Sequence, residues 1–214
     1  MIAPIRHLKY ILLLLLPALT ICIHLSRAEG SFYEIKFVFD GDTILLSNGE
    51  KVRYLGINAP EIDHDGGKSD PLAHEARREN INILKGHKVR LELDLEKRDT
   101  HGRLLAHVFL DNGGLVSELL LKIGYAHVLR VKPNVKYWDQ MLETQRKAMK
   151  QGAGIWGLKI KDDPAGYRGN TDSFVFHRKS CLFGKKVSVR HSKPFKTRQE
   201  AFFEGFSPCR KCRP

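Results

Sequence analysis

The residues best suited to phosphoester chemistry fall in three short strings: DGDT at 40–43, RYLGINAPE at 53–61 and DTHGR at 99–103. Attack of water on a phosphodiester builds negative charge on the non-bridging oxygens, so such a site needs a cation, positive donors and a base. Asp42 could supply a hard oxygen ligand for calcium. Arg53 and Arg103 offer planar forks that can hold a phosphate bidentately, and Glu61 could orient or deprotonate the attacking water.

Each of these residues also has a plainer structural interpretation. Asp-Gly pairs are common hairpin signals, which would account for Asp40 and Asp42. Arg53 could be an exposed strand charge, Glu61 an acid near a helix and Arg103 an arginine in a loop. Taken singly, these interpretations are favoured. Together, the order and spacing of the three strings resemble those of a known enzyme family, and this resemblance favours a catalytic site.

The elements that must position these residues form an α+β pattern. Five segments rich in Val, Ile, Leu and Phe, separated by Asp, Gly and Asn, predict a small, mostly antiparallel barrel with strands at 32–38, 44–46, 52–57, 89–95 and 104–110. Three helices are predicted at 71–85 with Asp70 as cap, at 115–123 before Gly124, and from a cap at Asn134 to Gly152. Strands in this number, with helices after the third and fifth, predict a mainly β OB-fold barrel with three added helices.

Together with KPN at 132–134 and GIWG at 154–157, the three strings resemble the staphylococcal nuclease (thermonuclease) family over most of residues 33–157. The resemblance implies an OB-fold and calcium-dependent hydrolysis of DNA or RNA that leaves 3′-phosphates, in endonuclease or exonuclease mode. It further implies roles for several residues around Asp42. Asn58 and the carbonyl of Ala59 would complete the protein ligands of calcium, Thr43 and Glu61 would act through bound water, Asp40 would be a supporting carboxylate, and Lys132 would contact substrate. His101, beside Arg103, could also touch the substrate, although a lone loop histidine is more often only exposed to solvent.

The sequence departs from the family pattern at two places. Asn58 stands where an aspartate is common, and its amide oxygen carries no charge, so we expect weaker calcium affinity or an altered ion preference. Leu129 and Val131 replace two tyrosines of the family's best-known member, which predicts reduced base stacking. Asn58 keeps an alternative open: a catalytically weak or inactive nucleic-acid-binding OB-fold protein with a zinc-binding, DNA-contacting tail.

The C-terminal tail carries a second set of ligand-type residues. His177 and Cys181 form H-x3-C, and after 27 residues Cys209 and Cys212 form C-x2-C, a ligand set that suits tetrahedral zinc. Within this tail, Thr197 and Glu200 predict a capping box for a short helix that ends at Gly205.

Residues 174–214 of this tail resemble the zinc-binding domain at the start of the bacterial Ada methyl-phosphotriester repair protein. His177 occupies the position of the methyl-accepting cysteine in that domain, so the resemblance implies a structural, DNA-contacting role. Disulfide formation among the three cysteines remains the alternative in an oxidising compartment. A polar linker is predicted at 159–173, between this module and the barrel domain at 29–158.

The first 28 residues have the layout of a signal peptide. A basic start precedes an apolar run from Ile11 to Ile23, and Ser26-Arg27-Ala28 predicts cleavage after Ala28 and export to the periplasm or the medium. An uncleaved membrane anchor stays open. Residues 161–214 carry 13 basic and 5 acidic side chains, which favours a polyanionic partner such as DNA or RNA. After signal cleavage we expect a monomer with no stable membrane partner.

Overall fold

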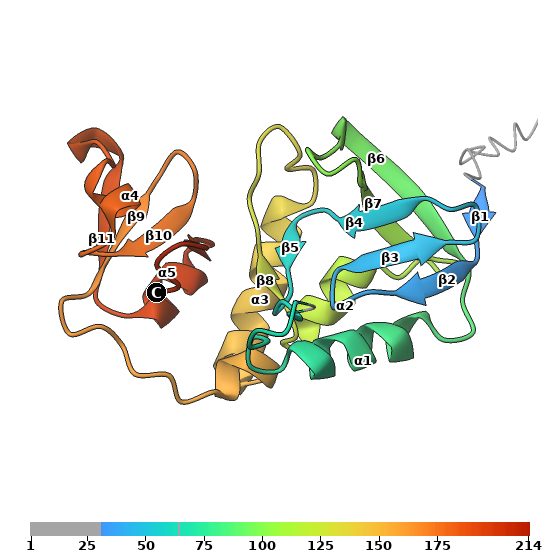
Figure 1. Cartoon of the computed structure of the whole chain (residues 1–214), viewed down its shortest axis with the longest axis horizontal. Helices are drawn as coiled ribbons and strands as arrows, with labels where there is room; N and C mark the ends of the chain where they lie inside the picture. Colours follow the sequence, from blue (N-terminus) through green and yellow to red (C-terminus); the bar gives the residue numbers. More distant parts are fainter. Residues whose placement is uncertain (1–30, 64) are drawn as a thin grey trace, which may run out of the picture.

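The computed structural model describes residues 31–63 and 65–214, so the predicted signal peptide at 1–28 lies outside the described residues. Figure 1 shows a barrel-like sheet with flanking helices on one side and a smaller C-terminal sheet on the other. Within the described part of the chain, no helix has both the length and the apolar character needed to cross a membrane. The elements that form the larger part confirm the predicted α+β class.

The larger sheet has the strand order β1-β6-β7-β4-β3-β2. Neighbouring strands in it pair antiparallel, except for β4 and β7, which run parallel. Its strands are β1 (Phe32–Tyr33), β2 (Ile35–Val38), β3 (Thr43–Leu46), β4 (Lys51–Tyr54), β6 (Val89–Arg98) and β7 (Leu104–Leu110). Two short strands, β5 (Ile57–Asn58) and β8 (His127–Val128), pair with each other beside this sheet.

The alternation of apolar residues along the strands builds the barrel core. Ile44 and Leu46 of β3, Val52 of β4 and Val108 of β7 are all fully buried, as expected for side chains on the inner face of a curved sheet. The helices α1 (Ala73–Leu84), α2 (Val116–Lys122) and α3 (Trp138–Gln151) pack against this core.

Two predicted helix caps are wrong. Helix α1 begins after Leu72, and Asp70 instead accepts the Glu61 N–H at 3.1 Å, which ties down the loop between β5 and α1. Helix α3 begins after Tyr137, and Asn134 binds strand β6 through both the N–H and the carbonyl of Glu96, at 2.8 and 2.7 Å. In both cases a tertiary partner takes the side chain that the local pattern assigned to the helix end.

The tail forms its own sheet with the order β11-β9-β10-β12. Its strands are β9 (Tyr167–Asn170), β10 (Val175–Arg178), β11 (Ser192–Phe195) and β12 (Ser207–Pro208), and its helices are α4 (Leu182–Lys185), η2 (Val189–His191) and α5 (Arg198–Phe203). Strand β9 pairs with β10 and β11. The segment predicted as a linker therefore ends inside this sheet, because Tyr167 is fully buried and fills its core despite the polar residues around it. The capping box of Thr197 and Glu200 is confirmed on α5.

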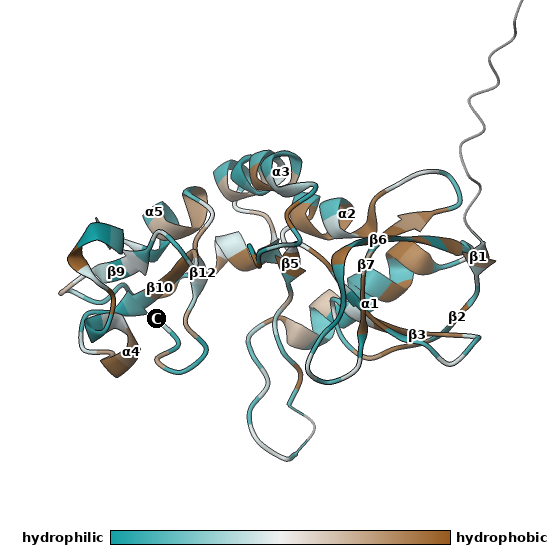
Figure 2. Cartoon of the chain, turned by 90° about the horizontal axis from the view of Figure 1, so that it is seen from above, coloured by the Kyte–Doolittle hydropathy of each residue, from teal (hydrophilic) through white to brown (hydrophobic). Residues whose placement is uncertain are grey.

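The tail packs directly on the barrel domain. Helix α3 lies between the two (Figure 2) and contacts α2 on one side and α5 on the other. Ala148 of α3 and Trp156 of η1 (Gly154–Gly157) belong to the same buried cluster as Phe176, Phe202 and Phe206 of the tail. This shared core fixes the tail's position next to strands β5 and β8.

Candidate active site and metal centre

The loop before β3 places Asp40 and Asp42 in a tight turn. The Asp42 N–H donates to Asp40 Oδ1 at 2.9 Å, and Asn80 of α1 donates to the Asp40 carbonyl at 3.1 Å. Gly41 allows the loop to approach its neighbours, since a Cβ there would lie 2.5 Å from the Ala59 Cβ. The DG pair thus serves close packing as well as the turn.

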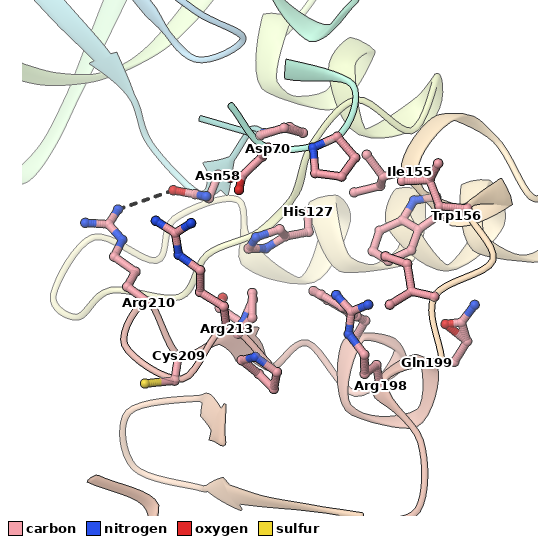
Figure 3. Close-up of a pocket in the computed structure, with 18 of the residues that line it drawn as sticks. Asn58, Asp70, His127, Ile155, Trp156, Arg198, Gln199, Cys209, Arg210 and Arg213 are labelled. Atoms are coloured by element: carbon pink, nitrogen blue, oxygen red, sulfur yellow. Dashed lines mark hydrogen bonds between the residues drawn. The ribbon is translucent and has the colours of Figure 1, made fainter. Parts of the chain in front are cut away.

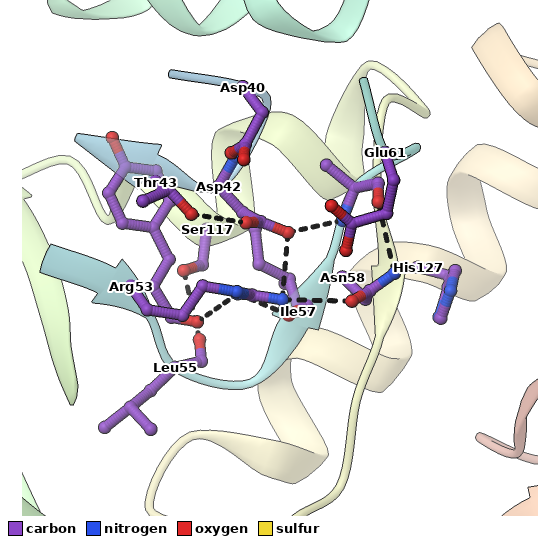
Figure 4. Close-up of polar contacts among 12 residues, drawn as sticks. Asp40, Asp42, Thr43, Arg53, Leu55, Ile57, Asn58, Glu61, Ser117 and His127 are labelled. Carbon is purple, nitrogen blue, oxygen red and sulfur yellow. Dashed lines mark hydrogen bonds and ion pairs between the residues drawn. The ribbon is translucent and has the colours of Figure 1, made fainter. Parts of the chain in front are cut away.

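Asp42 is the centre of the polar contacts in Figure 4. Its carboxylate is buried, with 4% side-chain exposure. Oδ2 accepts the Ala59 N–H at 2.7 Å and forms an ion pair with Arg53 Nη2 at 2.9 Å, while Oδ1 accepts the Thr43 hydroxyl at 3.1 Å. A carboxylate has about four lone-pair sites, so Asp42 keeps acceptor capacity for one further partner.

Arg53 in β4 turns its guanidinium toward the protein. Nη1 donates to the carbonyls of Tyr54 and Ile57 at 2.7 and 3.0 Å, and Nη2 donates to Asn58 Oδ1 at 3.0 Å in addition to its ion pair with Asp42. All four terminal N–H groups therefore have partners here. Arg53 holds the loop of Asn58 and Ala59 against Asp42, and to grip a phosphate with its fork it would have to exchange some of these contacts.

Three carboxylates gather in this region. Burial, followed by repulsion from Asp42, raises the pKa of Asp40 to about 7. Loss of hydration, again followed by repulsion from Asp42, also raises the pKa of Glu61, although Glu61 as a residue reaches solvent. Carboxylates that raise one another's pKa are stabilised as anions by a nearby cation. The oxygen donors of Asp42, Asn58, Ala59, Thr43 and Glu61 fit a hard divalent cation such as calcium.

Of the other predicted site residues, Arg103 lies near Arg53 in the sheet, and among the described residues no hydrogen bond or ion pair joins His101 or Lys132 to the carboxylate cluster. Leu105 of β7 pairs with Arg53, so Arg103, two residues earlier, lies on the Arg53 side of the sheet. Arg103 Nε binds Asp99 at 2.7 Å, and its side chain keeps 26% exposure. His101 lies exposed in the turn before it. Lys132 is exposed and pairs with Asp172 of the tail at 3.3 Å.

The tail brings its four ligand-type residues together. The ligand atoms of His177, Cys181, Cys209 and Cys212 all lie within 4.8 Å of one another, and the three cysteines are free thiols. Four ligands around a tetrahedral zinc with Zn–S of about 2.3 Å stand about 3.8 Å apart, close to this arrangement. Burial lowers the pKa of His177, which favours the neutral imidazole that binds metals. The cluster can hold a metal ion.

A cleft of about 870 Å³ separates this metal cluster from the carboxylates (Figure 3). Asn58, Ala59 and Glu61 line it from the barrel, and Arg198, Arg210 and Arg213 line it from the tail. These arginines are not among the site residues predicted from the sequence. The available signal was the string CRKCR at 209–213, where a metal-binding pair would hold its intervening residues in one place.

Comparison with known proteins gives the family context of this site. Residues 51–157 match the family model described as "Staphylococcal nuclease homologue". The match includes Arg53, Asn58, Glu61 and Arg103 and ends before the tail.

Three curated relatives are similar to the chain over its larger part. The SPbeta prophage-derived endonuclease YokF of Bacillus subtilis is 37% identical over 160 residues, which cover 72% of this chain and 54% of the relative. Endonuclease YncB of the same organism is 40% identical over 135 residues, covering 61% of this chain and 64% of the relative. The thermonuclease of Staphylococcus hyicus is 34% identical over 135 residues, covering 62% of this chain and 79% of the relative. The chain thus spans between half and two thirds of the first two relatives.

Proposed function

Because this chain belongs to the staphylococcal nuclease family, we propose that it is a nuclease that hydrolyses phosphodiester bonds of DNA or RNA. The observation that carries the proposal is that Asp42 and Arg53 bind the Asn58–Ala59 segment, which lines, together with Glu61, a cleft large enough for a short nucleotide segment. All three relatives described above carry the name endonuclease or thermonuclease.

The chain's own residues divide the chemistry between them. Glu61 reaches solvent at the cleft, and burial and the charge of Asp42 raise its pKa, which makes it a stronger base than an ordinary glutamate and suits a group that orients water and accepts its proton. Within residues 31–63 and 65–214 the side chain of Arg103 binds only Asp99, through Nε, so its terminal nitrogens can stabilise charge that develops on the phosphate oxygens. Arg53 contributes positive charge close to Asp42 and fixes the loop that carries Asn58 and Ala59.

The proposed metal at the carboxylate cluster is calcium. Asp42, Asn58 and the Ala59 carbonyl would hold it, with Thr43 and Glu61 acting through water and Asp40 supporting the turn. When bound, calcium neutralises charge on the phosphate oxygens. Products with 3′-phosphates are part of the same proposal.

Cleavage of single-stranded DNA with calcium or with chelator tests the proposal. We expect calcium-dependent cleavage that falls by about 100-fold or more in Glu61→Gln and Arg103→Ala, since each removes a proton-transfer or charge-stabilising group. Glu143→Gln, an exposed residue of α3, is the matched control and should cleave at the wild-type rate. Binding without cleavage in the wild type would favour the alternative of a nucleic-acid-binding protein without catalytic activity.

We further propose zinc as the ion of the tail, in a structural role as implied by the Ada-type resemblance. Four convergent soft or borderline ligands and the short secondary structure elements of this module support zinc over a disulfide. Purified protein should contain about one zinc per chain. A zinc-free tail with two of its cysteines oxidised to a disulfide would refute this assignment.

Export remains a proposal that depends on the first 28 residues. We propose cleavage after Ala28 and a periplasmic or secreted mature protein that acts as a monomer. The mass of protein recovered from an expressing cell's periplasm or medium should correspond to a chain that begins at Glu29. Full-length protein retained in membranes would indicate an uncleaved anchor instead.

A further inference from the structure

The cleft in Figure 3 has walls of opposite charge. Glu61 and Asp70 line it from the barrel domain. The tail side carries one acidic side chain, Asp162, and an excess of positive charge from Arg178, Arg198, Arg210 and Arg213. Among the four arginines, Arg210 is the one that contacts a residue of the proposed calcium site. Its Nη2 donates to Asn58 Oδ1 at 3.3 Å, across 152 positions of sequence, and its charge lowers the pKa of Glu61 against the larger effects that raise it.

Arg210 and Arg213 are held in place by the fold of the tail. Arg210 lies between Cys209 and Cys212, and Arg213 follows directly, so a metal ion held by the four ligand-type residues would fix the backbone of both. The guanidinium of Arg178 binds this segment: Nε donates to the Cys212 carbonyl at 3.2 Å, and Nη2 donates to the Arg213 carbonyl at 3.1 Å.

The segment is also anchored to the barrel domain. Ser207 Oγ donates to the Val128 carbonyl at 2.9 Å, one residue from His127 on the cleft floor. The side chains of Arg210 and Arg213 remain exposed, and within residues 31–63 and 65–214 neither forms an ion pair with a carboxylate. Two guanidinium groups that line the cleft without a carboxylate partner are suited to bind an anion from outside the chain.

We propose that Arg210 and Arg213 form a second phosphate-binding wall of the cleft, which grips phosphates of the same polynucleotide strand that flank the scissile one. The proposal rests on the proposed nuclease function and extends its substrate from a single phosphodiester to a segment of several nucleotides. A sphere of the cleft's volume is only about 12 Å across, the width of the major groove alone, so the cleft takes one strand and not a duplex. The tail thereby replaces the tyrosines absent at Leu129 and Val131 as the source of substrate affinity.

Binding of a fluorescent single-stranded 12-mer, measured by anisotropy in the Glu61→Gln background, tests the proposal directly. Each phosphate contact to a single strand contributes about 0.7 to the slope of log K against log salt. The double variant Arg210→Gln/Arg213→Gln should therefore lower that slope by about 1.4 and weaken binding by about 10- to 15-fold at 0.15 M salt.

Matched variants separate this wall from the general basicity of the tail. Lys185→Gln/Arg190→Gln removes the same charge from exposed tail positions outside the cleft and should leave affinity within about twofold of the parent. Arg210→Lys/Arg213→Lys keeps the charge and should retain the salt slope. Equal losses in the cleft pair and the control pair would overturn the proposal. Zinc content and the thermal midpoint of each variant establish that the tail remains folded.

Steady-state cleavage distinguishes this proposal from the proposed function. With wild-type Glu61, the cleft double variant should raise KM for the 12-mer about tenfold and leave KM for a chromogenic dinucleotide-sized diester unchanged, because the small substrate has no flanking phosphates. An unchanged KM for the 12-mer, or an equal rise in KM for both substrates, would refute the wall. If the wild type cleaves neither substrate, the nuclease function fails, and the binding series still decides whether the arginines hold the strand.

Discussion

Gln145 of α3 offers the sharpest test of how the tail is joined to the barrel domain. Its side chain is fully buried, and it accepts the Val128 N–H of β8 at 2.7 Å while donating to the Phe202 carbonyl of α5 at 2.6 Å. One residue thus satisfies a backbone group on each side of the interface. Gln145→Leu keeps most of the volume and removes both hydrogen bonds.

The two losses differ in cost. The Val128 N–H is left buried without an acceptor, which costs about 2 kcal/mol. The Phe202 carbonyl still accepts the Gly205 N–H at 2.9 Å, so its loss costs only about 1 kcal/mol. The greater apolar burial of leucine offsets part of this sum. We therefore expect the free energy of unfolding to fall by about 2–3 kcal/mol.

The assay can follow the interface itself, because both tryptophans of the chain lie there. Trp138 contacts Phe174 and Trp156 contacts Phe202, with ring centroids 5.8 and 5.1 Å apart. In urea, the Gln145→Leu fluorescence transition should shift to lower concentration at least as far as the circular dichroism transition. Gln151→Leu, at the exposed end of the same helix, should change stability by less than about 0.5 kcal/mol. If Gln145→Leu unfolds at the same urea concentration as the wild type, the two hydrogen bonds do not contribute the stability assigned to them.

Three further outcomes are expected. Burial lowers the pKa of His127 to about 4 from an unfolded value near 6.5, so the unfolded chain binds more protons and stability is lost as pH falls through this window. Denaturation experiments should show that lowering the pH from 7 to 5 costs about 2 kcal/mol of stability through this residue, and that His127→Gln lacks this loss. Asn58→Asp adds a negative charge to the proposed calcium ligands and removes the Nδ2 hydrogen bond to the Ala59 carbonyl, so titration calorimetry should give about tenfold tighter calcium binding. Unchanged affinity would contradict the assignment of residue 58 as a ligand. Cys212→Ser should reduce bound zinc and lower the thermal midpoint, whereas equal metal content by elemental analysis would exclude Cys212 as a ligand.

Local patterns predicted the parts of the fold that depend on local chemistry. The apolar strands and the capping box of Thr197 and Glu200 follow from alternation and from side-chain bonding within one turn. The caps assigned to Asp70 and Asn134 are wrong because the partners of these side chains, Glu61 and Glu96, lie 9 and 38 residues away and come within reach only in the folded chain. Tertiary hydrogen bonds overrode the local preference at both positions.

The candidate site was predictable to the same extent. Residue types and spacing identified Asp42, Arg53 and Glu61, since their separation along the chain fits two adjoining strands and the loop after them. The direction of the Arg53 fork, toward Asp42 and backbone carbonyls, depends on where the 57–59 loop folds back. The approach of Arg210 depends on packing between two modules, and no pattern within either module contains it.

Asn58 has a different meaning in the structure than in the sequence alone. As a metal ligand it is a weakened aspartate, but here its amide donates to the Ala59 carbonyl at 3.1 Å while its oxygen accepts from both Arg53 and Arg210. An aspartate could not donate, and would set its carboxylate against that carbonyl oxygen. Both lone pairs of Asn58 Oδ1 are occupied by guanidinium groups, so a cation that uses this oxygen has to displace one of them. Arg210 makes the longer contact and comes from the exposed segment, so it would be the group to leave, and its guanidinium would then be free for a phosphate in the cleft.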